Sequence, residues 1–502
     1  MDDNVSSSSG SLGDLPPREM RSSLHRIVDW ASDYRETIER RPIGPAVQPG
    51  EIAAHCPADA PDEPESLDAI LADIDSVVMP GIVHWGHPAF LGYFGSTSNG
   101  PALLGEIVAA ALNVSAMTWR TSPAATELEG VVLEWIRRMI GLSDAFMGVV
   151  YDTASVAVFH ALAAARERCA PMIRERGIAG RTDVPVCRVY ASDQAHSSIE
   201  KAMIALGLGE TNVVRIPSDS VFRLDVAALR AAIEADVQSG FRPMAVIATV
   251  GTTSTTSVDP VAEIWPVCRE HNAWLHVDAA YGGALGILPE GRWALDGVDR
   301  ADSVVVNPHK WMFVPLDFSA LYTRHPAALR AVFSLTPDYL RGDAAVGQVD
   351  YMDYGLQLGR RFRALKAWMV FRAFGRAGIA GRIREHCRLA QQWASWVDAD
   401  PMFERAAPVP MAVVCFRCVR QEIDDDECDR LNEAIVRAVN ASGEAYLTHT
   451  TLRGRTVMRV GIGNVLTTSE HLERAWECVR REAQRHIPNA MDPSAGSVRD
   501  IG

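Results

Sequence analysis

The stretch WLHVDAAYGG, residues 274–283, decides the fold class of this chain. It opens with an apolar run that is typical of a buried strand, and Asp278 follows that run directly. A second apolar run, residues 303–306, leads into NPHKW and places Lys310 just beyond its end. From about residue 100 to 375 such runs alternate with helical patterns, which is typical of βα units. We therefore predict an α/β fold with a mostly parallel central sheet.

Three further apolar runs in this region also end in polar residues. They are MGVVY before Asp152, VCRVY before ASDQAH, and MAVIATV before Gly251. The carboxyl ends of parallel strands share one edge of a sheet, and ligands bind in the crevice there. We therefore expect the residues after all five runs to converge on one site. The candidates are Thr153, Ala154, Ser155, His196, Thr253, Asp278, Ala280, Asn307, His309 and Lys310.

The chemical types of these residues suit a single ligand. Thr153 and Ser155 begin a predicted helix, where backbone N–H groups and the helix dipole favour an anion such as phosphate. A buried Asp278 needs a cation or a strong donor, a Lys310 with a lowered pKa could act as a nucleophilic amine, and His196 could stack on a flat ring. A phosphate, a protonated ring nitrogen, an aldehyde and a ring face together describe pyridoxal 5′-phosphate. Each residue also has a structural alternative: an Asp278–Lys310 ion pair, a core histidine, or ordinary helix caps.

The composition excludes several classes of protein. The chain has 502 residues, of which 48% are hydrophobic and 22% charged, so it has the material for a large folded core. A formal net charge of −14 argues against a nucleic-acid partner. No apolar stretch reaches the roughly 18–20 residues that span a membrane, and the acidic, polar N-terminus does not resemble a secretory signal, so we expect a cytoplasmic protein. The nine scattered cysteines fit reduced thiols, and the pair Cys415-x-x-Cys418 lacks a second pair, so we expect no metal site.

The sequence also suggests how the chain is divided. We expect an unstructured leader at 1–18, an N-terminal helical segment at 19–99, a large cofactor-binding α/β domain at 100–375, a smaller C-terminal α+β domain at 376–487 and a tail at 488–502. Ser122-Pro123 predicts a helix start, because serine caps helices and proline suits the first helical position. The spacing of apolar residues in 360–375 predicts a long packed helix, and Ser197 with Glu200 predicts a capping box.

Nine stretches carry a resemblance to a known family. They are HPAFLGYF (87–94), TSPAATELE (121–129), SDQAHSS (192–198), GTTS (251–254), HVDAAYGG (276–283), NPHKW (307–311), DYL (338–340), LGRRFRALK (358–366) and ERAWE (473–477). On these stretches the chain resembles the group II pyridoxal-phosphate-dependent decarboxylases, and among them the aromatic-L-amino-acid decarboxylases. The resemblance runs from about residue 20 to 485.

The resemblance implies a type I aminotransferase-like fold, a homodimer and roles for individual residues. Lys310 matches the lysine that binds the cofactor covalently, Asp278 the carboxylate that keeps the pyridine nitrogen protonated, and His196 the histidine stacked on the ring. Tyr339 matches a mobile-loop tyrosine that protonates the substrate's α-carbon. The remaining matches line the cofactor (Thr153, Ala154, Ser155, Thr253, Ala280, Asn307, His309) or the substrate pocket (Trp85, Tyr93, Phe94, Ser115, Met117, Gly359), with Ser115 and Met117 supplied by the neighbouring subunit.

Two positions depart from the family pattern. Asp152 stands where the family usually has glycine, which is awkward beside a phosphate unless the acid points away. Met117 stands where phenylalanine is frequent, which widens the pocket. Gly359 matches a position where plant relatives with indole substrates have glycine and those with phenolic substrates have serine.

The implied activity is decarboxylation of an aromatic L-amino acid (tryptophan or 5-hydroxytryptophan, tyrosine, dopa or phenylalanine) to the arylalkylamine and carbon dioxide. A decarboxylase of glutamate, histidine or aspartate is an alternative, but an acidic substrate needs a basic pocket residue, and 85–96 contains no lysine or arginine. An aromatic acetaldehyde synthase is a second alternative, against which His196 and Tyr339 argue. A catalytically silent relative is a third, but it would lack Lys310 or Asp278.

Overall fold

The computed structural model describes residues 14–95, 97–169, 172–335 and 348–486. These residues form two compact units that divide after His87. The N-terminal unit contains three α-helices: α1 (Pro17–Thr37), α2 (Glu51–His55) and α3 (Leu67–Asp73). No helix among the described residues is long and apolar enough to cross a membrane.

The C-terminal unit is built on a seven-stranded sheet in the order β1-β7-β6-β5-β4-β2-β3. Its strands are β1 (Met147–Tyr151), β2 (Cys187–Ser192), β3 (Val213–Ile216), β4 (Arg242–Thr249), β5 (Trp274–Asp278), β6 (Ser303–Val306) and β7 (Ser319–Thr323). Only β7 runs against its two neighbours, and all the other neighbouring pairs are parallel. Every residue of β5 and β6 is buried, as expected for central strands covered on both faces. The prediction of an α/β fold with a mostly parallel central sheet is confirmed.

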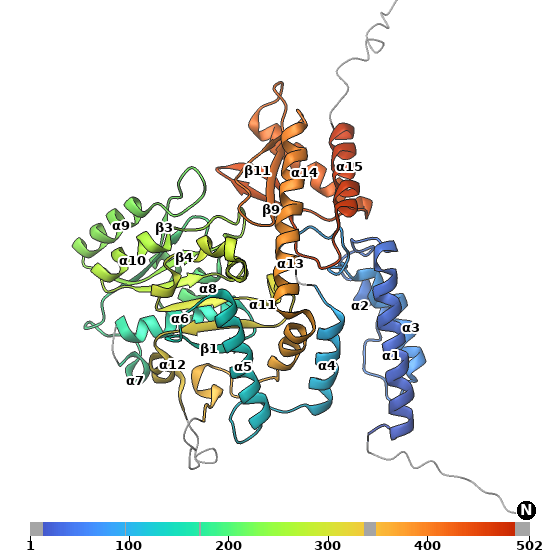
Figure 1. Cartoon of the computed structure of the whole chain (residues 1–502), viewed down its shortest axis with the longest axis horizontal. Coiled ribbons are helices and arrows are strands. Elements are labelled where there is room, and N and C mark those ends of the chain that lie inside the picture. The colour runs from blue at the N-terminus through green and yellow to red at the C-terminus, as the bar shows by residue number, and fades with distance from the viewer. Residues whose placement is uncertain (1–13, 96, 170–171, 336–347, 487–502) are drawn as a thin grey trace, which may run out of the picture. The chain divides into compact units, whose positions relative to one another are not determined.

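Helices connect the strands and cover the sheet (Figure 1). They are α4 (Gly100–Leu112), α5 (Pro123–Ile140), α6 (Ala154–Cys169), α7 (Ile173–Arg176), α8 (Ser198–Ala205), α9 (Val226–Gln238), α10 (Val261–Glu270), α11 (Pro308–Trp311) and α12 (Pro326–Phe333). Helix α6 packs on both β1 and β4–β7, so it crosses the centre of the sheet. The predicted start of α5 is confirmed, because the Ser122 hydroxyl accepts the Ala125 N–H at 3.4 Å and Pro123 is the first helical residue.

A smaller antiparallel sheet follows in the order β10-β11-β9-β8. Its elements are β8 (Phe403–Arg405), β9 (Val413–Cys418), β10 (Thr448–Leu452) and β11 (Arg455–Gly461), with helices α14 (Asp425–Ser442) and α15 (Ser469–His486). Cys415 and Cys418 are three residues apart on β9, which places them on opposite faces and in different apolar clusters. Both are free thiols.

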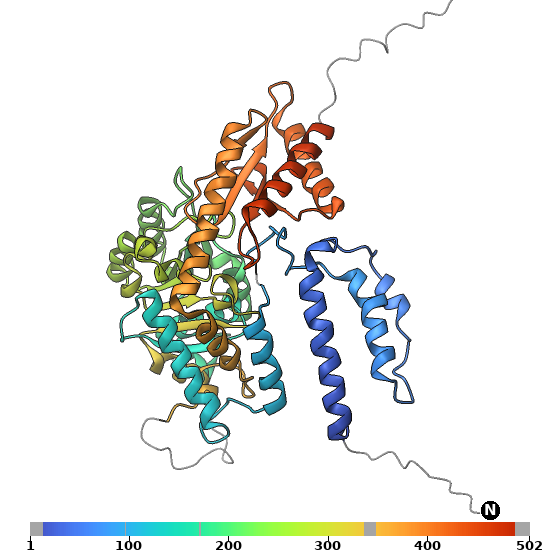
Figure 2. The same ribbon diagram turned by 45° about the vertical axis from the view of Figure 1, so that its right-hand side comes forward.

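Helix α13 (Ala364–Ala399) packs on α4 and α5 at one end and on β8, β9 and α15 towards the other (Figures 1 and 2). The helix predicted over 360–375 was wrong at its start. It begins only at Ala364, because Arg360 turns into the core and forms an ion pair with Glu129 at 2.7 Å. Its predicted end coincides with Gly375, whose non-helical φ of 63° forms a kink, and a second helical stretch follows within α13.

Candidate active site

Five parallel strands deliver their carboxyl ends to one edge of the large sheet. The last residues of β1, β2, β4, β5 and β6 are Tyr151, Ser192, Thr249, Asp278 and Val306. Each of these strands is followed within a few residues by predicted site residues. The topology therefore brings together the clusters that the sequence places after the five apolar runs.

Lys310 lies on the short helix α11, directly after β6. Its Nζ atom is 5.0 Å from the centre of the Phe94 ring. Burial lowers the pKa of this amine; the charge of Asp278 opposes the effect and the Arg459 guanidinium adds to it. A lowered pKa increases the fraction of unprotonated, nucleophilic amine near neutral pH.

Asp278 ends β5 and is 8% exposed. Its Oδ1 atom accepts the Ala280 N–H at 3.0 Å, which orients the carboxylate. Its backbone oxygen accepts the Val250 N–H at 2.8 Å and so links the ends of β4 and β5. Asp278 is thus a buried carboxyl group with a fixed orientation at the end of β5.

His196 lies between β2 and α8; the residue is accessible to solvent at this edge, but its ring is partly desolvated by its surroundings. Its Nδ1 atom accepts the Ser198 N–H at 3.1 Å, so the unprotonated nitrogen is Nδ1. Burial is the main cause that lowers the pKa of the ring, while the charges of Asp278 and Lys310 act on it in opposite directions. The charges of Asp278 and Lys310 both act on the His196 ring, which is consistent with one cluster at this edge.

The capping box predicted at the start of α8 was wrong. Ser197 makes no side-chain capping bond, because the His196 ring takes that place by accepting a first-turn N–H. Glu200 instead forms an ion pair with Arg215.

Thr153 immediately precedes α6, and its backbone oxygen accepts the Ala157 N–H at 3.1 Å. Ala154 and Ser155 form the first turn, where backbone N–H groups have no partner within the helix. Asp152, the acid that replaces the family's glycine, is held by other side chains. Its carboxylate lies 2.6 Å from the Arg363 guanidinium and accepts a Gln357 amide N–H at 3.0 Å. The helix start therefore remains suited to an anion.

The remaining cofactor candidates line the same edge. Asn307 accepts the Ser319 hydroxyl at 2.6 Å, and its N–H is bonded to the Ala280 carbonyl at 3.1 Å. His309 Nδ1 accepts the Phe318 N–H at 3.1 Å. Burial, with a contribution from the Lys310 charge, lowers the pKa of His309 to about 3, so the ring is neutral.

Aromatic rings stack beside Lys310. The rings of Phe94 and Tyr281 are 3.9 Å apart between centroids, and the rings of Tyr281 and Trp311 are 4.6 Å apart. Tyr93 is half exposed and adopts a left-handed backbone conformation with φ 54°. The rings of Tyr93, Phe94, Tyr281 and Trp311 form an aromatic wall, which could receive a flat apolar group.

Arg459 on β11 is a site residue that the sequence reasoning missed. Its guanidinium carbon lies 4.8 Å from the centre of the Phe94 ring, and Nη1 donates to the Tyr93 carbonyl at 2.7 Å. Its Nε atom donates to the carbonyl of Thr253 at 3.1 Å. The signal in the sequence was an arginine inside the apolar run TVMRVGIG, because burying a charged side chain is costly unless it is paired or hydrogen-bonded.

Other predicted residues are not part of this cluster as described. Trp85 belongs to the N-terminal unit. Ser115 and Met117 lie in the loop after α4 and bond to Arg360 N–H and Met352 N–H, respectively. Gly359 is exposed with open space around the position of a side chain. Tyr339 lies outside the described residues.

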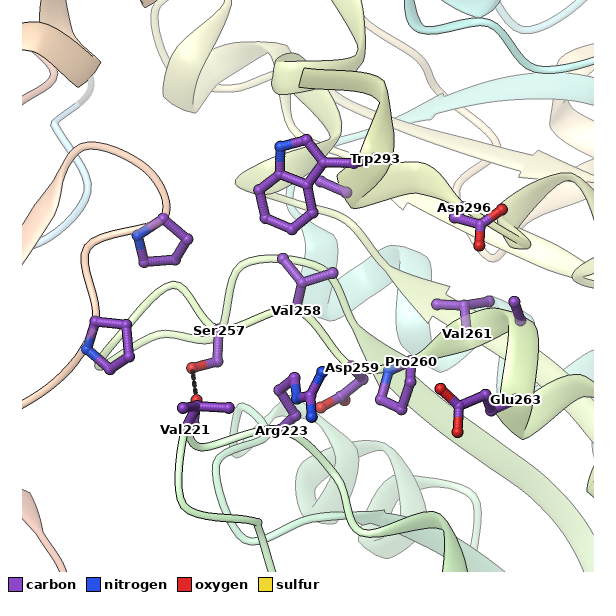
Figure 3. A pocket seen from close by; sticks show the side chains of 14 residues that line it. Val221, Arg223, Ser257, Val258, Asp259, Pro260, Val261, Glu263, Trp293 and Asp296 are labelled. Carbon is purple, nitrogen blue, oxygen red and sulfur yellow. Dashed lines mark hydrogen bonds between the residues drawn. The ribbon is translucent and has the colours of Figure 1, made fainter. Parts of the chain in front are cut away.

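A separate pocket of about 400 Å³ lies beside the loops that flank Pro260 (Figure 3). It contains none of the predicted site residues, and Trp293 lies across it from Val258. Asp259 has a structural role there, because its carboxylate accepts the N–H groups of Leu224 and Thr249, each at 2.7 Å. Burial raises the pKa of Asp259 to about 7. This carboxyl therefore fixes the end of β4.

Comparison with known proteins gives a consistent result. The family model of the pyridoxal-dependent decarboxylase conserved domain matches residues 49–419. The chain is 38% identical to the phenylacetaldehyde synthase of Arabidopsis thaliana over 94% of this chain and 97% of that one. It is 39% identical to the aromatic-L-amino-acid decarboxylase of Sus scrofa over 92% and 96% of the two chains. The crystal structure of Oryza sativa TDC with PLP and tryptamine superposes with a TM-score of 0.91 at 36% identity, covering 95% and 99% of the chains.

Proposed function

Because the chain belongs to the pyridoxal-dependent decarboxylase family, we propose that it converts an aromatic L-amino acid into the arylalkylamine and carbon dioxide. The observation that carries the proposal is the position of Lys310 at the carboxyl edge of a parallel sheet, 5.0 Å from the centre of the Phe94 ring and under the electrostatic influence of Asp278. An amine, a buried carboxylate and an aromatic wall meet there.

The donor set of this edge fits pyridoxal 5′-phosphate. The start of α6 offers free N–H groups and the hydroxyls of Thr153 and Ser155 to a phosphate. Asp278 offers an oriented negative charge to a protonated ring nitrogen. When bound, the cofactor supplies a ring that accepts the electron pair left by the departing carbon dioxide.

With the cofactor bound, the residues of the chain would have different roles in the reaction. Lys310 would hold the cofactor through its Nζ atom, the nucleophilic amine of the site. Asp278 holds the proton on the ring nitrogen, and His196 covers one face of the ring. Thr253, Ala280, Asn307 and His309 complete the cofactor surround. Tyr339 delivers the proton to the substrate's α-carbon.

The aromatic wall supports an aromatic substrate. Phe94 is stacked on Tyr281, so a flat side chain entering beside Tyr93 would bury its faces against rings. Arg459 is a basic group beside these rings; its Nε and Nη1 atoms donate to the carbonyls of Thr253 and Tyr93, whereas its buried Nη2 atom has no hydrogen-bond partner among the described residues. The panel of substrates below therefore includes glutamate and aspartate.

A panel of amino acids tests the proposed activity. The full-length protein is loaded with pyridoxal phosphate and incubated separately with each aromatic amino acid, with dopa, and with glutamate, histidine and aspartate. Products are identified by mass, and carbon dioxide is measured in parallel. We expect equal amounts of an arylalkylamine and carbon dioxide from at least one aromatic substrate. Amine formation only from glutamate, histidine or aspartate would refute the proposal.

Aromatic acetaldehyde synthesis is the second candidate, and the similarity to the Arabidopsis thaliana phenylacetaldehyde synthase favours it. The two activities differ in products, since the synthase reaction also consumes oxygen and releases ammonia and peroxide. His196 and the sequence match at Tyr339 support simple decarboxylation. The same panel decides: aldehyde and peroxide in place of amine would identify a synthase.

A homodimer is part of the proposal. Helix α4 exposes Leu104, Val108 and Leu112 at a spacing of four residues, which forms one apolar stripe. The loop that follows α4 carries Ser115 and Met117. A second copy seated on this stripe would therefore bring those residues towards its partner's site.

Light scattering on the wild type and on Leu104→Asp tests the dimer. We expect a dimeric wild type, and a variant with a raised monomer fraction and reduced activity, because a buried charge opposes association. Val131→Asp on α5 is the matched control, because Val131 is also an exposed helical residue but lies off the stripe. A fully active monomeric wild type would contradict the proposal.

The free cysteines support a reducing, cytoplasmic location.

A further inference from the structure

Two thiols meet at the edge of the sheet opposite the candidate active site. Cys169 is the last residue of α6, and Cys187 is the first residue of β2. Their Sγ atoms are 3.2 Å apart. Since β2 runs towards His196, the pair lies at the far end of two elements whose other ends carry site residues. The thiols themselves have no part in the proposed decarboxylation.

The two cysteines differ in environment. Cys169 is partly exposed, whereas Cys187 is 3% exposed. The hydrogen bond with Cys187 is the main cause that lowers the pKa of Cys169, and the charge of Arg242 adds to it. The hydrogen bond and burial both raise the pKa of Cys187. Arg242 is the residue of β4 directly opposite Cys187 in the sheet, so the positive charge is fixed beside the pair.

This arrangement separates the roles of a reactive and a resolving thiol. A thiolate is the nucleophile in thiol oxidation, and partly exposed cysteines near a positive charge are the reactive ones. Cys169 meets both conditions. Cys187 is sheltered from solvent but already in contact with Cys169. A disulfide bond is about 2.0 Å long, so the sulfur atoms need to approach by only about 1 Å.

We propose that Cys169 and Cys187 are a redox modification site, at which hydrogen peroxide forms an intrachain disulfide. The Cys169 thiolate attacks one peroxide oxygen, the O–O bond breaks, and hydroxide leaves and is protonated to water. Cys169 is then a sulfenic acid. The Cys187 sulfur, losing its proton, attacks Cys169 Sγ and displaces the hydroxyl, which leaves as a second water. Overall, two thiols lose two protons and two electrons, and one peroxide takes them up to become two waters.

The disulfide would close the segment between α6 and β2 into a covalent ring. This segment contains α7, which packs on α6 (Figure 1). Closing such a loop removes conformations from the unfolded chain and so favours the folded state. The oxidised protein should therefore resist thermal unfolding better, while the opposite edge of the sheet stays unchanged and decarboxylation continues.

A peptide map of the full-length protein is the first test. The protein is treated with hydrogen peroxide, free thiols are blocked with N-ethylmaleimide, and trypsin is used without a reductant. The chain provides tryptic peptides CAPMIR (169–174) and TDVPVCR (182–188). We expect these two peptides joined, at a mass lower by two hydrogen atoms than their sum, and separated by dithiothreitol. Blocked thiols on both peptides, or Cys169 joined to another cysteine such as Cys56, would overturn the proposal.

Variants provide the second test. Cys187→Ser should abolish the joined peptide and leave Cys169 as a trappable sulfenic acid. Cys387→Ser is the matched control, because Cys387 is also partly exposed but burial raises its pKa to about 12. The Cys387→Ser variant should form the Cys169–Cys187 disulfide as the wild type does. The wild type should gain several degrees in Tm on oxidation, reversibly with dithiothreitol. A Tm that rises equally in Cys187→Ser would refute the ring closure.

Discussion

Arg459 shows how a single buried residue shapes the candidate substrate site. It is 4% exposed, and burial is the main cause that lowers its pKa. Its Nε and Nη1 atoms donate to the carbonyls of Thr253 and Tyr93, so one guanidinium joins β11 to two loops at the aromatic wall. A buried charge with several hydrogen bonds holds its partners firmly, because releasing them would leave the charge unpaired.

The variant Arg459→Lys tests this positioning role. Lysine keeps the charge but cannot reach all the carbonyls with a planar fork. We expect kcat/KM for the aromatic substrate to fall by about tenfold, mainly through KM, because Tyr93 and Phe94 lose their support. Arg453→Lys is the control, since Arg453 is an exposed arginine in the neighbouring turn. Kinetics equal to those of the control would show that Arg459 does not position the wall.

Gly359 offers a test of substrate choice at the same scale. No atom lies within 4 Å of the position that a side chain would take there, so Gly359→Ser should fold normally. We expect the ratio of tryptophan to tyrosine turnover to fall by about fivefold or more, since a hydroxyl there would favour a phenolic ring by about 1 kcal/mol. An unchanged ratio in competition assays, with unchanged Tm, would remove Gly359 from the substrate pocket.

At the scale of elements, Arg363 connects three segments of the candidate cofactor site. Its guanidinium lies 2.6 Å from Asp152, which precedes α6, and 3.0 Å from Asp317, which precedes β7. Burial raises the pKa of Asp317, but the Arg363 charge and hydrogen bond outweigh it and lower that pKa. Arg363 itself leads into α13. This ion-pair network compensates for an acid where the resembling family has glycine.

The variant Arg363→Gln should weaken cofactor binding. Asp152 would lose its cation and repel the phosphate, so we expect the Kd for pyridoxal phosphate to rise about tenfold, or roughly 1.4 kcal/mol. Absorbance titration of the cofactor measures this effect. Arg361→Gln is the control, because Arg361 is an exposed arginine two residues earlier, and Asp152→Asn should rescue the Arg363→Gln variant. Failure of the rescue would refute the electrostatic explanation.

The elements also show what the sequence could predict. Lys310, Asp278 and His196 could be predicted as site candidates because each follows an apolar run, and a run with its adjacent residues is a local pattern. The capping box and the start of α13 were mispredicted because distant or neighbouring side chains intervene. Arg360 is drawn to Glu129, far away in the sequence, and His196 outcompetes Ser197 as the acceptor at the start of α8.

Residues joined only by the tertiary fold could not be found from the sequence. Arg459 lies on β11 of the smaller sheet and contacts Phe94, which lies far away in the sequence. No spacing rule links two residues so far apart. The same reason applies to Asp152, whose partner Arg363 lies far along the chain. Periodicity reports the neighbours within an element, whereas these contacts depend on how elements pack.

At the scale of the whole molecule, buried neutral histidines couple stability to pH. His160, His276 and His386 are buried, and burial lowers the pKa of each to about 4. Hydrogen bonds fix the neutral forms: His386 Nδ1 accepts the Trp311 N–H at 3.1 Å, and His160 Nε2 accepts the Leu356 N–H at 3.1 Å. These rings would have to lose such bonds to take up a proton.

The folded protein should therefore lose stability as the solution becomes acidic. Above about pH 6.5 these histidines are neutral in both the folded and the unfolded chain. Between about pH 6.5 and 4 only the unfolded chain binds the protons, so each histidine lowers the free energy of unfolding by up to about 1.4 kcal/mol per pH unit. Thermal unfolding across this range measures the slope, and His386→Gln should reduce it. A Tm that stays constant down to about pH 5 would contradict this account.

The most direct measurement of the central claim is the attachment point of the cofactor. The chain has three lysines, Lys201, Lys310 and Lys366. Lys201 is exposed on α8, and Lys366 donates to Glu106 at 2.6 Å. The protein loaded with pyridoxal phosphate is reduced with borohydride, digested and mapped by mass. We predict the cofactor on Lys310, within residues 301–324, and no covalent cofactor in Lys310→Ala. A label on Lys201 or Lys366, or none, would contradict the proposed active site.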